Sequence, residues 1–276
     1  MKKIIDLLKD SIIPILELIL LIFAFIFPIT CNVAGIFDCI FDNIMMNFDN
    51  LKYFFLMKIG NVGIGVVFTL ILLCRIRMHN CKTEIFTGNH YHNYPYSWYW
   101  ICSKLLGFQR CILIRVPIAI QFKLVINDTF ASYNYGNEYP VLNDEKIMVD
   151  DSCNDTYTDE INLVLSDTYP ISSELLPYNR NNLTTIYIKR NNTMDSNRYY
   201  SPEFVKAVMN TVNSLPVNVH SINLFPTLNP RHSYEIANNV FKKGGRGRID
   251  TLTVFPQSYR NDSWKFERSG IIIFKA

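Results

Sequence analysis

Two long apolar runs in the first 75 residues constrain this chain more than any other feature. The first extends from about Ile12 to Ile29 and the second from about Phe54 to Cys74. Each approaches the roughly 20 residues that a helix needs to cross a bilayer core. A signal peptide is the alternative for the first run, which however lacks a small-x-small cleavage site. A buried core helix is the alternative for the second run, whose segment "VGIGVVFTLILLC" is too uniformly apolar to favour it.

Basic residues flank the two runs, whereas the loop between them, residues 30–53, is acidic. The flanks carry Lys2, Lys3, Lys9, Arg75, Arg77 and Lys82, and the loop carries Asp38, Asp42 and Asp49 against Lys52. By the positive-inside rule both flanks are cytoplasmic and the loop faces outward. We therefore predict a transmembrane hairpin in residues 1–82, with helices at about 12–29 and 54–74, that tethers a cytoplasmic domain of residues 83–276.

Five residues inside the hairpin are unusual for apolar helices. Glu17 and Lys58 are charged, and we expect both to snorkel to the interface rather than to pair. Gly60, Gly63 and Gly65 permit close approach between helices, which suits assembly of several hairpins.

Charge and cysteine content exclude several classes of protein. The formal net charge of +3 is too small to indicate a DNA or RNA duplex as partner. Seven cysteines without a C-x-x-C spacing indicate free thiols rather than a disulfide framework or a zinc ribbon. Four further candidates for metal ligation match no standard zinc spacing, so we predict no metal site: His79, Cys81, His90 and His92.

Residues 83–150 form the first half of the predicted cytoplasmic domain. This half is reduced and less regular than residues 161–276. Residues at helical spacing predict a helix that Gly107 ends: Trp98, Ile101, Leu105 and Phe108. The segment "CILIRVPIAIQFKLVIN" reads as two strands, with Pro117 at an edge or break. An acidic stretch from Asn134 to Glu160 then reads as solvated loop.

Strands and helices alternate clearly over residues 161–276. The predicted strands are "INLVLSD", "LTTIYIKR", "VHSINLFPT", "IDTLTVF" and "GIIIFKA". Ser201 and Pro202 open one helix as N-cap and first residue, and "YEIANNVFKK" forms another that Gly244 and Gly245 close. This alternation predicts an α/β fold with a mainly parallel, Rossmann-like sheet.

Ligands of such sheets bind outside the carboxyl ends of the strands. Three ends carry polar groups: the turn with Asp167 and Thr168, the loop from Thr227 to His232, and the turn with Gln257. The middle loop leads into a helix start, which suits an anionic ligand such as a phosphodiester. The run "KKGGRGR" at 242–248 is either a solvated helix end or an anion site.

Motifs for common chemistries are absent from the sequence. It holds no G-x-G-x-x-G after a strand, no Walker A loop, no G-x-S-x-G and no H-E-x-x-H. We therefore predict no catalytic residue and no cofactor.

The segments "VLSDTYPI" and "LFPTLNPRHSYEIANNVF", followed by "TLTVF", resemble the second half of SAVED domains. The order of hairpin and sensor is similar to that of SAVED effectors with two transmembrane helices. The resemblance implies an anti-phage CBASS effector of the bacterial inner membrane with both termini cytoplasmic. A cyclic di- or trinucleotide from a partner nucleotidyltransferase would bind, and homo-oligomerisation would disrupt the lipid bilayer. By position in the fold, the ligand-binding residues would be Asp167, Thr168, Thr227, Asn229, Arg231, His232 and Gln257.

Two other functions stay open at the level of sequence. A membrane-anchored enzyme acting on a nucleotide-sugar or lipid would use the same strand ends, with Asp167 as its carboxylate. A structural or docking protein would use the aromatic stretch of residues 91–108 as its interface.

Overall fold

The computed structural model describes residues 2–41, 51–136, 139–151, 157–180, 182–190, 199–242, 249–260 and 263–275. The chain forms two compact units. Unit 1 contains residues 1–90 and 100–111, and unit 2 contains residues 91–99 and 112–276. Residues 83–90 and 100–111, which we predicted to be part of the cytoplasmic domain, are thus grouped with the apolar helices.

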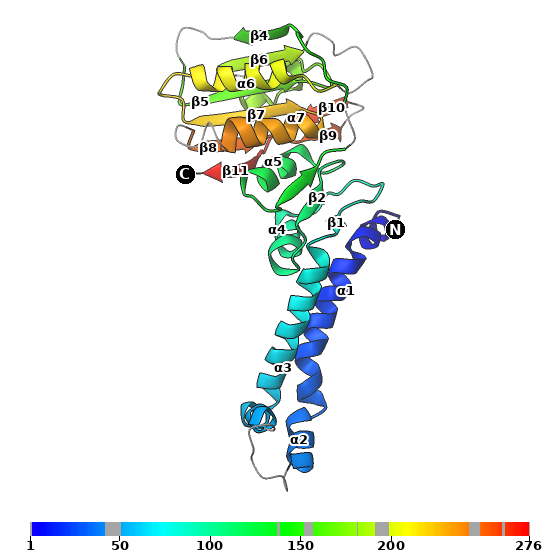
Figure 1. Cartoon of the computed structure of the whole chain (residues 1–276). Coiled ribbons are helices and arrows are strands. Elements are labelled where there is room, and N and C mark those ends of the chain that lie inside the picture. Colours follow the sequence, from blue (N-terminus) through cyan, green and yellow to red (C-terminus); the bar gives the residue numbers. More distant parts are fainter. Residues whose placement is uncertain are drawn as a thin grey trace. The chain divides into compact units, whose positions relative to one another are not determined.

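The two apolar runs of unit 1 are long helices (Figure 1). Helix α1 spans Lys2–Thr30, the short α2 spans Val33–Phe41, and α3 spans Leu51–Asn80. The segments Ser11–Thr30 and Lys58–Asn80 are long and apolar enough to cross a membrane. Only 17% of the most apolar window of each is buried within the protein, as expected for a surface that lipid covers.

Gly65 sets how closely α1 and α3 pack. A Cβ atom at this position would lie 2.5 Å from the carbonyl oxygen of Phe25 in α1. At Gly63 the obstacle would be the side chain of Ile59 in the same helix, and Gly60 (φ +73°) has open space around it. Of the three glycines predicted to permit helix approach, Gly65 therefore does so within this hairpin.

The predicted helix near residue 100 exists, but its buried positions do not follow the spacing used to predict it. Helix α4 (Tyr96–Trp100) continues as the π-helical turn η1 (Ile101–Leu105), and Gly107 (φ +85°) follows. Phe108 is buried together with Tyr99, Cys102 and Leu106, whereas Trp98 and Ile101 are half-buried and Leu105 is exposed. A π-turn holds more residues than an α-turn, so the regular spacing used for the prediction does not apply.

A six-stranded sheet in the order β11-β8-β7-β5-β6-β4 organises unit 2 (Figure 1). Its inner strands β8, β7, β5 and β6 are parallel, and the edge strands β4 and β11 are antiparallel to their neighbours. The strands span Ile147–Asp151 (β4), Glu160–Ser166 (β5), Thr185–Arg190 (β6), Ser221–Thr227 (β7), Thr251–Val254 (β8) and Ile271–Lys275 (β11). The predicted α/β class with a mainly parallel sheet is confirmed.

Helices lie against one face of this sheet (Figure 1). Helix α6 (Pro202–Ser214) begins as predicted, since the Ser201 hydroxyl accepts a hydrogen bond from the Phe204 N–H. Helix α7 (Pro230–Glu235) continues as the π-helical η4 (Ile236–Lys242). Gly244 and Gly245, predicted to end this helix, lie outside the described residues, as does most of the basic run 242–248.

Two elements of unit 2 correct the sequence analysis. The second predicted strand of "CILIRVPIAIQFKLVIN" is the helix α5, Ile118–Ile126, and Pro117 is its N-cap. A continuous apolar run does not distinguish a buried strand from a buried helix, and α5 is buried on nearly all sides. The predicted acidic loop contains β4, because the pairing with β6 outweighs the low strand propensity of aspartate.

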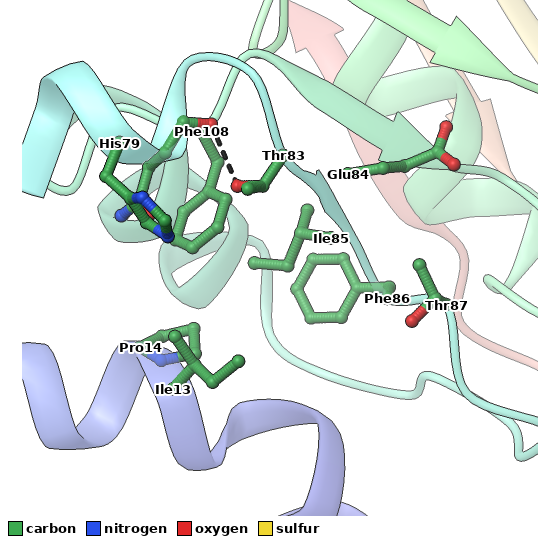
Figure 2. Close-up of a pocket in the computed structure, with 10 residues that line it drawn as sticks. Ile13, Pro14, His79, Thr83, Glu84, Ile85, Phe86, Thr87 and Phe108 are labelled. Atoms are coloured by element: carbon green, nitrogen blue, oxygen red, sulfur yellow. Dashed lines mark hydrogen bonds between the residues drawn. The ribbon is translucent and has the colours of Figure 1, made fainter.

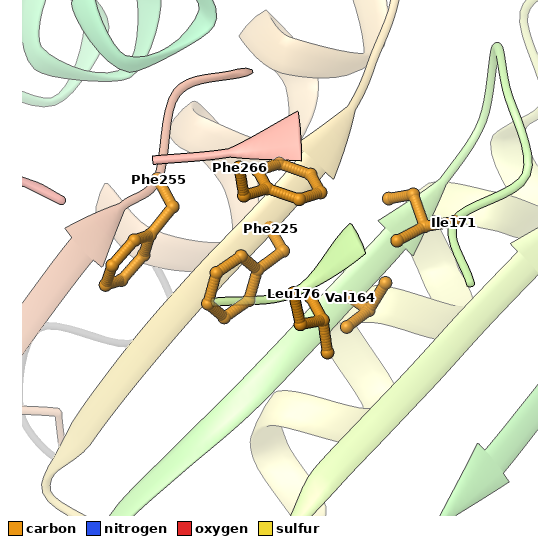
Figure 3. Packing of buried hydrophobic residues seen from close by; sticks show 6 residues of the cluster. All are labelled: Val164, Ile171, Leu176, Phe225, Phe255 and Phe266. Atoms are coloured by element: carbon orange, nitrogen blue, oxygen red, sulfur yellow. The ribbon is translucent and has the colours of Figure 1, made fainter. Parts of the chain in front are cut away.

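The second face of the sheet is covered by short elements instead of long helices. These are the 3₁₀ turns η2 (Ser173–Leu175) and η3 (Tyr178–Arg180) and the hairpin β9–β10 (Gln257–Arg260 and Ser263–Phe266). Figure 3 shows the apolar cluster beneath them, formed by Val164, Ile171, Leu176, Phe225, Phe255 and Phe266. The rings of Phe225 and Phe255 stack at 4.5 Å, and Phe266 meets Phe225 edge-on. This cluster fixes the hairpin beside the carboxyl ends of β7 and β8.

The remaining strands are short. In unit 1, β1 (Glu84–Ile85) pairs in parallel with β2, which spans Arg110–Ile112. In unit 2, β3 spans Ser132–Asn134.

Candidate ligand-binding site

A buried polar network lies where β5, β6 and β7 end. Asp167, directly after β5, accepts hydrogen bonds on both carboxylate oxygens. Its Oδ1 is 2.7 Å from Nη1 of Arg190, the last residue of β6. Its Oδ2 accepts the Asn229 N–H at 2.9 Å and lies 2.7 Å from Nδ1 of His232. Arg190 also donates through Nε to the carboxylate of Glu145 at 2.9 Å. The network therefore joins three strand ends to the start of α7.

Burial and charge set the ionisation of this network. Burial alone would raise the pKa of Asp167, but His232, the Asn229 N–H and Arg190 together lower it below its usual value. Burial likewise opposes the charge of Arg190, yet the carboxylates of Glu145 and Asp167 raise the pKa of its guanidinium. A charge-paired cluster of this kind fixes geometry, because removing any member leaves a charge buried without its partner.

His232 is engaged at both ring nitrogens. The backbone N–H of Ser201 lies 2.9 Å from Nε2, and a backbone N–H can only donate. The Ser201 carbonyl oxygen lies 3.3 Å from the same nitrogen, and Nδ1 lies 2.7 Å from Oδ2 of Asp167 and 2.9 Å from the side-chain amide of Asn229. An Asp–His pair is a common device of hydrolytic catalysis, but here the nitrogen that would act as base is occupied by the backbone. The arrangement is that of a structural clamp between α6 and α7.

A cavity of about 490 Å³ lies within unit 2, and Pro226 of β7 forms part of its lining. Its volume falls in the range of about 300–1,000 Å³ typical of small-molecule sites. The lining comes from the segment before α4, the first turn of α5, and the ends of β7 and β8 with the hairpin that follows. The residues are Tyr91, Asn93, Pro117, Ile118, Ala119, Ile120, Pro226, Phe255, Pro256, Gln257, Ser258, Trp264, Glu267 and Ile271.

Three chemical features of the cavity suit a nucleotide. The first turn of α5 borders it, and Pro117 provides no side-chain cap, so the helix start can receive an anion. Trp264 and Tyr91 expose 59% and 63% of their surface and offer flat faces for base stacking. Gln257 brings an amide, and Glu267 brings a carboxylate that can accept from a base N–H.

A smaller cavity, about 170 Å³, lies in unit 1 beside the ends of α1 and α3. Figure 2 shows Ile85, Phe86 and Phe108 pointing toward Ile13 and Pro14 of α1. Its volume lies below the range typical of small-molecule sites, so we place no nucleotide there.

Nearby, polar bonds tie the ends of the apolar helices together. Asn80 at the end of α3 donates to the Glu17 carboxylate at 2.8 Å and to the Leu106 carbonyl at 3.1 Å. Glu17, predicted to snorkel, therefore has a partner within unit 1.

Comparison with known families identifies the chain. Residues 1–273 match the model of the "SMODS- and Ubiquitin system-associated 2TM effector domain". The chain belongs to this effector family. The predicted class of membrane effector with two N-terminal spanning helices is thereby confirmed. No curated protein sequence matches significantly.

Comparison with solved structures gives partial similarities, including three to one receptor. The Acinetobacter baumannii Cap4 SAVED/CARF-domain receptor with the cyclic trinucleotide 2'3'3'-cAAA matches with a TM-score of 0.44 and 6% identity, over 63% of this chain and 41% of that chain. The same receptor with 3'3'3'-cAAA gives 0.44 and 6%, over 65% and 42%. Without ligand the receptor gives 0.39 and 8%, over 65% and 39%. The effector thus spans less than half the length of these receptors.

The predicted ligand residues of the effector separate into three groups. Gln257 lines the cavity. The side chains of Asp167, Asn229 and His232 are buried in the network, and Thr168 and Thr227 bond to the backbone beside it. Arg231 stands apart, with its guanidinium carbon 3.7 Å from the centre of the Tyr200 ring. The structure therefore brings one of the seven to the cavity wall and five into or beside the buried network.

Other residues of the site were not predicted from the sequence. The α5 start escaped because its segment was read as a strand, and Trp264 because the β9–β10 hairpin was not predicted. Arg190 ends a predicted strand, so the rule that ligand sites gather at strand ends could have found it. Glu145 gave no signal within an acidic stretch.

Two cysteine thiols are buried among the described residues. Burial raises the pKa of Cys102 to about 12 and that of Cys111 well above its ordinary value. Neither provides the thiolate that a cysteine nucleophile needs. Among the described residues, no three His, Cys, Asp or Glu side chains gather in a way that could hold a metal ion.

Proposed function

We propose that the protein is an anti-phage membrane effector that binds a cyclic di- or trinucleotide in the 490 Å³ cavity of unit 2. Ligand binding drives homo-oligomerisation, and the clustered hairpins then disrupt the inner membrane. The signal comes from a partner nucleotidyltransferase, and the effector itself performs no catalysis. Both termini are cytoplasmic, so unit 2 meets the ligand in the cytosol.

The cavity carries this proposal. A phosphodiester fits the start of α5, where backbone N–H groups and the helix dipole favour negative charge. A base fits against Trp264 or Tyr91, whose rings are exposed at the rim. Glu267 would repel a phosphate, so it faces the polar edge of a base. The cavity thus offers a place for the anionic phosphate of a nucleotide, for the flat face of its base and for the polar edge of that base.

The buried network gives the cavity a fixed wall. Pro226 lines the cavity, and the next residue, Thr227, donates to the Leu165 and Tyr169 carbonyls. We infer that Asp167, Asn229 and His232 are positioning residues, because their side chains are bonded to one another and closed to solvent.

Assembly follows from linkage. A ligand that binds the assembled state more tightly than the separate chains favours assembly by the difference in binding free energy. Gathering hairpins then raises their density in the bilayer without new chemistry. The lipid bilayer and further copies of the chain are thus the effector's partners.

The test is calorimetric titration of the full chain in detergent with a panel of cyclic di- and trinucleotides, including the two cAAA isomers. We expect one ligand to bind and Trp264→Ala to weaken it about 5- to 150-fold, since base stacking contributes about 1–3 kcal/mol. Tyr178→Ala is the matched control, because Tyr178 is 91% exposed and lies outside the cavity lining. A folded protein that binds no member of the panel, or binds equally well without Trp264, contradicts the proposal. Recovery of the ligand unchanged tests the absence of catalysis.

A further inference from the structure

Strand β4 forms one edge of the six-stranded sheet, and its outer side is open. The strand pairs with β6 on one side, from Ile147 opposite Arg190 to Asp151 opposite Ile186, without a bulge. Among the described residues no strand pairs with the other side. Open, regular edges invite pairing with another chain, and proteins normally protect them with proline, bulges or charges.

Two apolar side chains of this edge are unusually exposed. Met148 and Val149 expose 48% and 52% of their surface. Lys146, before the strand, and Asp150, within it, are exposed as well. Because alternate residues of a strand point to opposite faces, Lys146, Met148 and Asp150 lie on one face and Ile147 and Val149 on the other.

We propose that β4 pairs antiparallel with β4 of a second copy, with Met148 on the two-fold axis. In this register Lys146 of each copy lies opposite Asp150 of the other, and the two Met148 side chains meet between these ion pairs. On the opposite face Ile147 lies against Val149 of the other copy. Charge thus meets opposite charge and apolar meets apolar, which is the self-complementarity that a two-fold interface requires.

The remaining charges near the edge accept this register. Asp151 would lie opposite Glu145 of the other copy, but the Glu145 carboxylate is bound to Arg190, so its charge is already compensated. The same Arg190–Glu145 pair anchors the start of β4 to the end of β6. The edge is therefore held in place by the buried network that also contains Asp167. The pairing extends the sheet across two copies and does not depend on the proposed ligand.

Charge reversal tests the pairing in the full chain in detergent. Sedimentation over a concentration series should show a dimer for the natural sequence. Lys146→Glu alone and Asp150→Lys alone should each raise the dimer dissociation constant about tenfold or more, because each converts two attractions into repulsions. An equimolar mixture of the two variants should recover the dimer, since every facing pair then has opposite charge. Both side chains are exposed, so the thermal midpoint should stay unchanged at a concentration where the natural sequence and the variants are all monomers.

Lys206→Glu, an exposed lysine on α6, is the matched control and should leave the dissociation constant unchanged. A monomer at every concentration overturns the proposal. An assembly whose dissociation constant is unchanged by both charge reversals also overturns it, as does a mixture of the two variants that fails to recover the dimer. Loss of ligand binding with the dimer intact would count against the proposed function alone, so the two failures are distinguishable.

Discussion

Removal of the Asp167 carboxylate should destabilise unit 2 more than any surface charge change. The side chain is buried and compensates Arg190, and it also accepts from the Asn229 N–H and contacts His232. Asp167→Ala leaves these donors without their shared acceptor. Breaking a buried ion pair from one side costs about 3–5 kcal/mol. At about 2–4 °C per kcal/mol for a domain of this size, the melting midpoint should fall by roughly 6–20 °C.

The assay is thermal unfolding of the full chain in detergent, followed by tryptophan fluorescence. Asp250→Ala is the matched control, since Asp250 forms an exposed pair with His220 at 3.3 Å. Exposed pairs contribute about 0–1 kcal/mol, so this midpoint should move by no more than roughly 4 °C. Equal shifts for the two variants would refute the idea that the network supports the strand ends.

Three further changes have defined outcomes. The lowered pKa of Asp167 adds stability that is present above about pH 4 and is lost as the pH falls through the folded-state pKa. The fall in melting midpoint caused by Asp167→Asn, measured from pH 7 downward, should therefore become smaller only in that acidic range. A fall that becomes smaller near neutral pH contradicts the assignment. Gly65→Ala should lower the melting midpoint of the full chain in detergent more than Gly63→Ala does. The reason is that only the methyl group at position 65 meets a backbone atom, the Phe25 carbonyl oxygen. Equal effects of the two variants argue against this packing. Gln257→Leu should weaken binding of the ligand found by titration about 2- to 12-fold, which corresponds to the loss of one hydrogen bond, and should leave the melting midpoint unchanged. An unaltered affinity would show that Gln257 does not belong to the site.

The fold could be predicted wherever the hydrophobic periodicity agrees with the residues that typically begin and end helices and strands. The strands of residues 161–276 are short apolar runs between polar turns, and Ser201-Pro202 is an unambiguous helix start. The hairpin followed from length and apolar composition alone. Local sequence failed at α5 and β4, because burial on all sides and pairing with β6 are decided by residues distant in the chain.

The candidate site was predictable only in outline. The carboxyl ends of parallel strands are fixed by topology, so Asp167, His232 and Gln257 could be placed near such ends from the sequence. Which of them line a cavity depends on side-chain direction. Asp167 and His232 turn toward Arg190 and the backbone of Ser201, while Gln257 opens the β9 strand at the cavity wall. The aromatic rim comes from a hairpin whose position depends on the phenylalanine cluster beneath it.

Dye release from lipid vesicles tests the central claim most directly. The full chain is reconstituted, and the cyclic di- and trinucleotides are added one at a time at the outer or inner surface. We expect one ligand to cause release with the natural sequence, and Trp264→Ala to require a higher concentration of that ligand. Release without any ligand, or no release by a protein that binds the ligand and is folded, would contradict ligand-triggered membrane disruption.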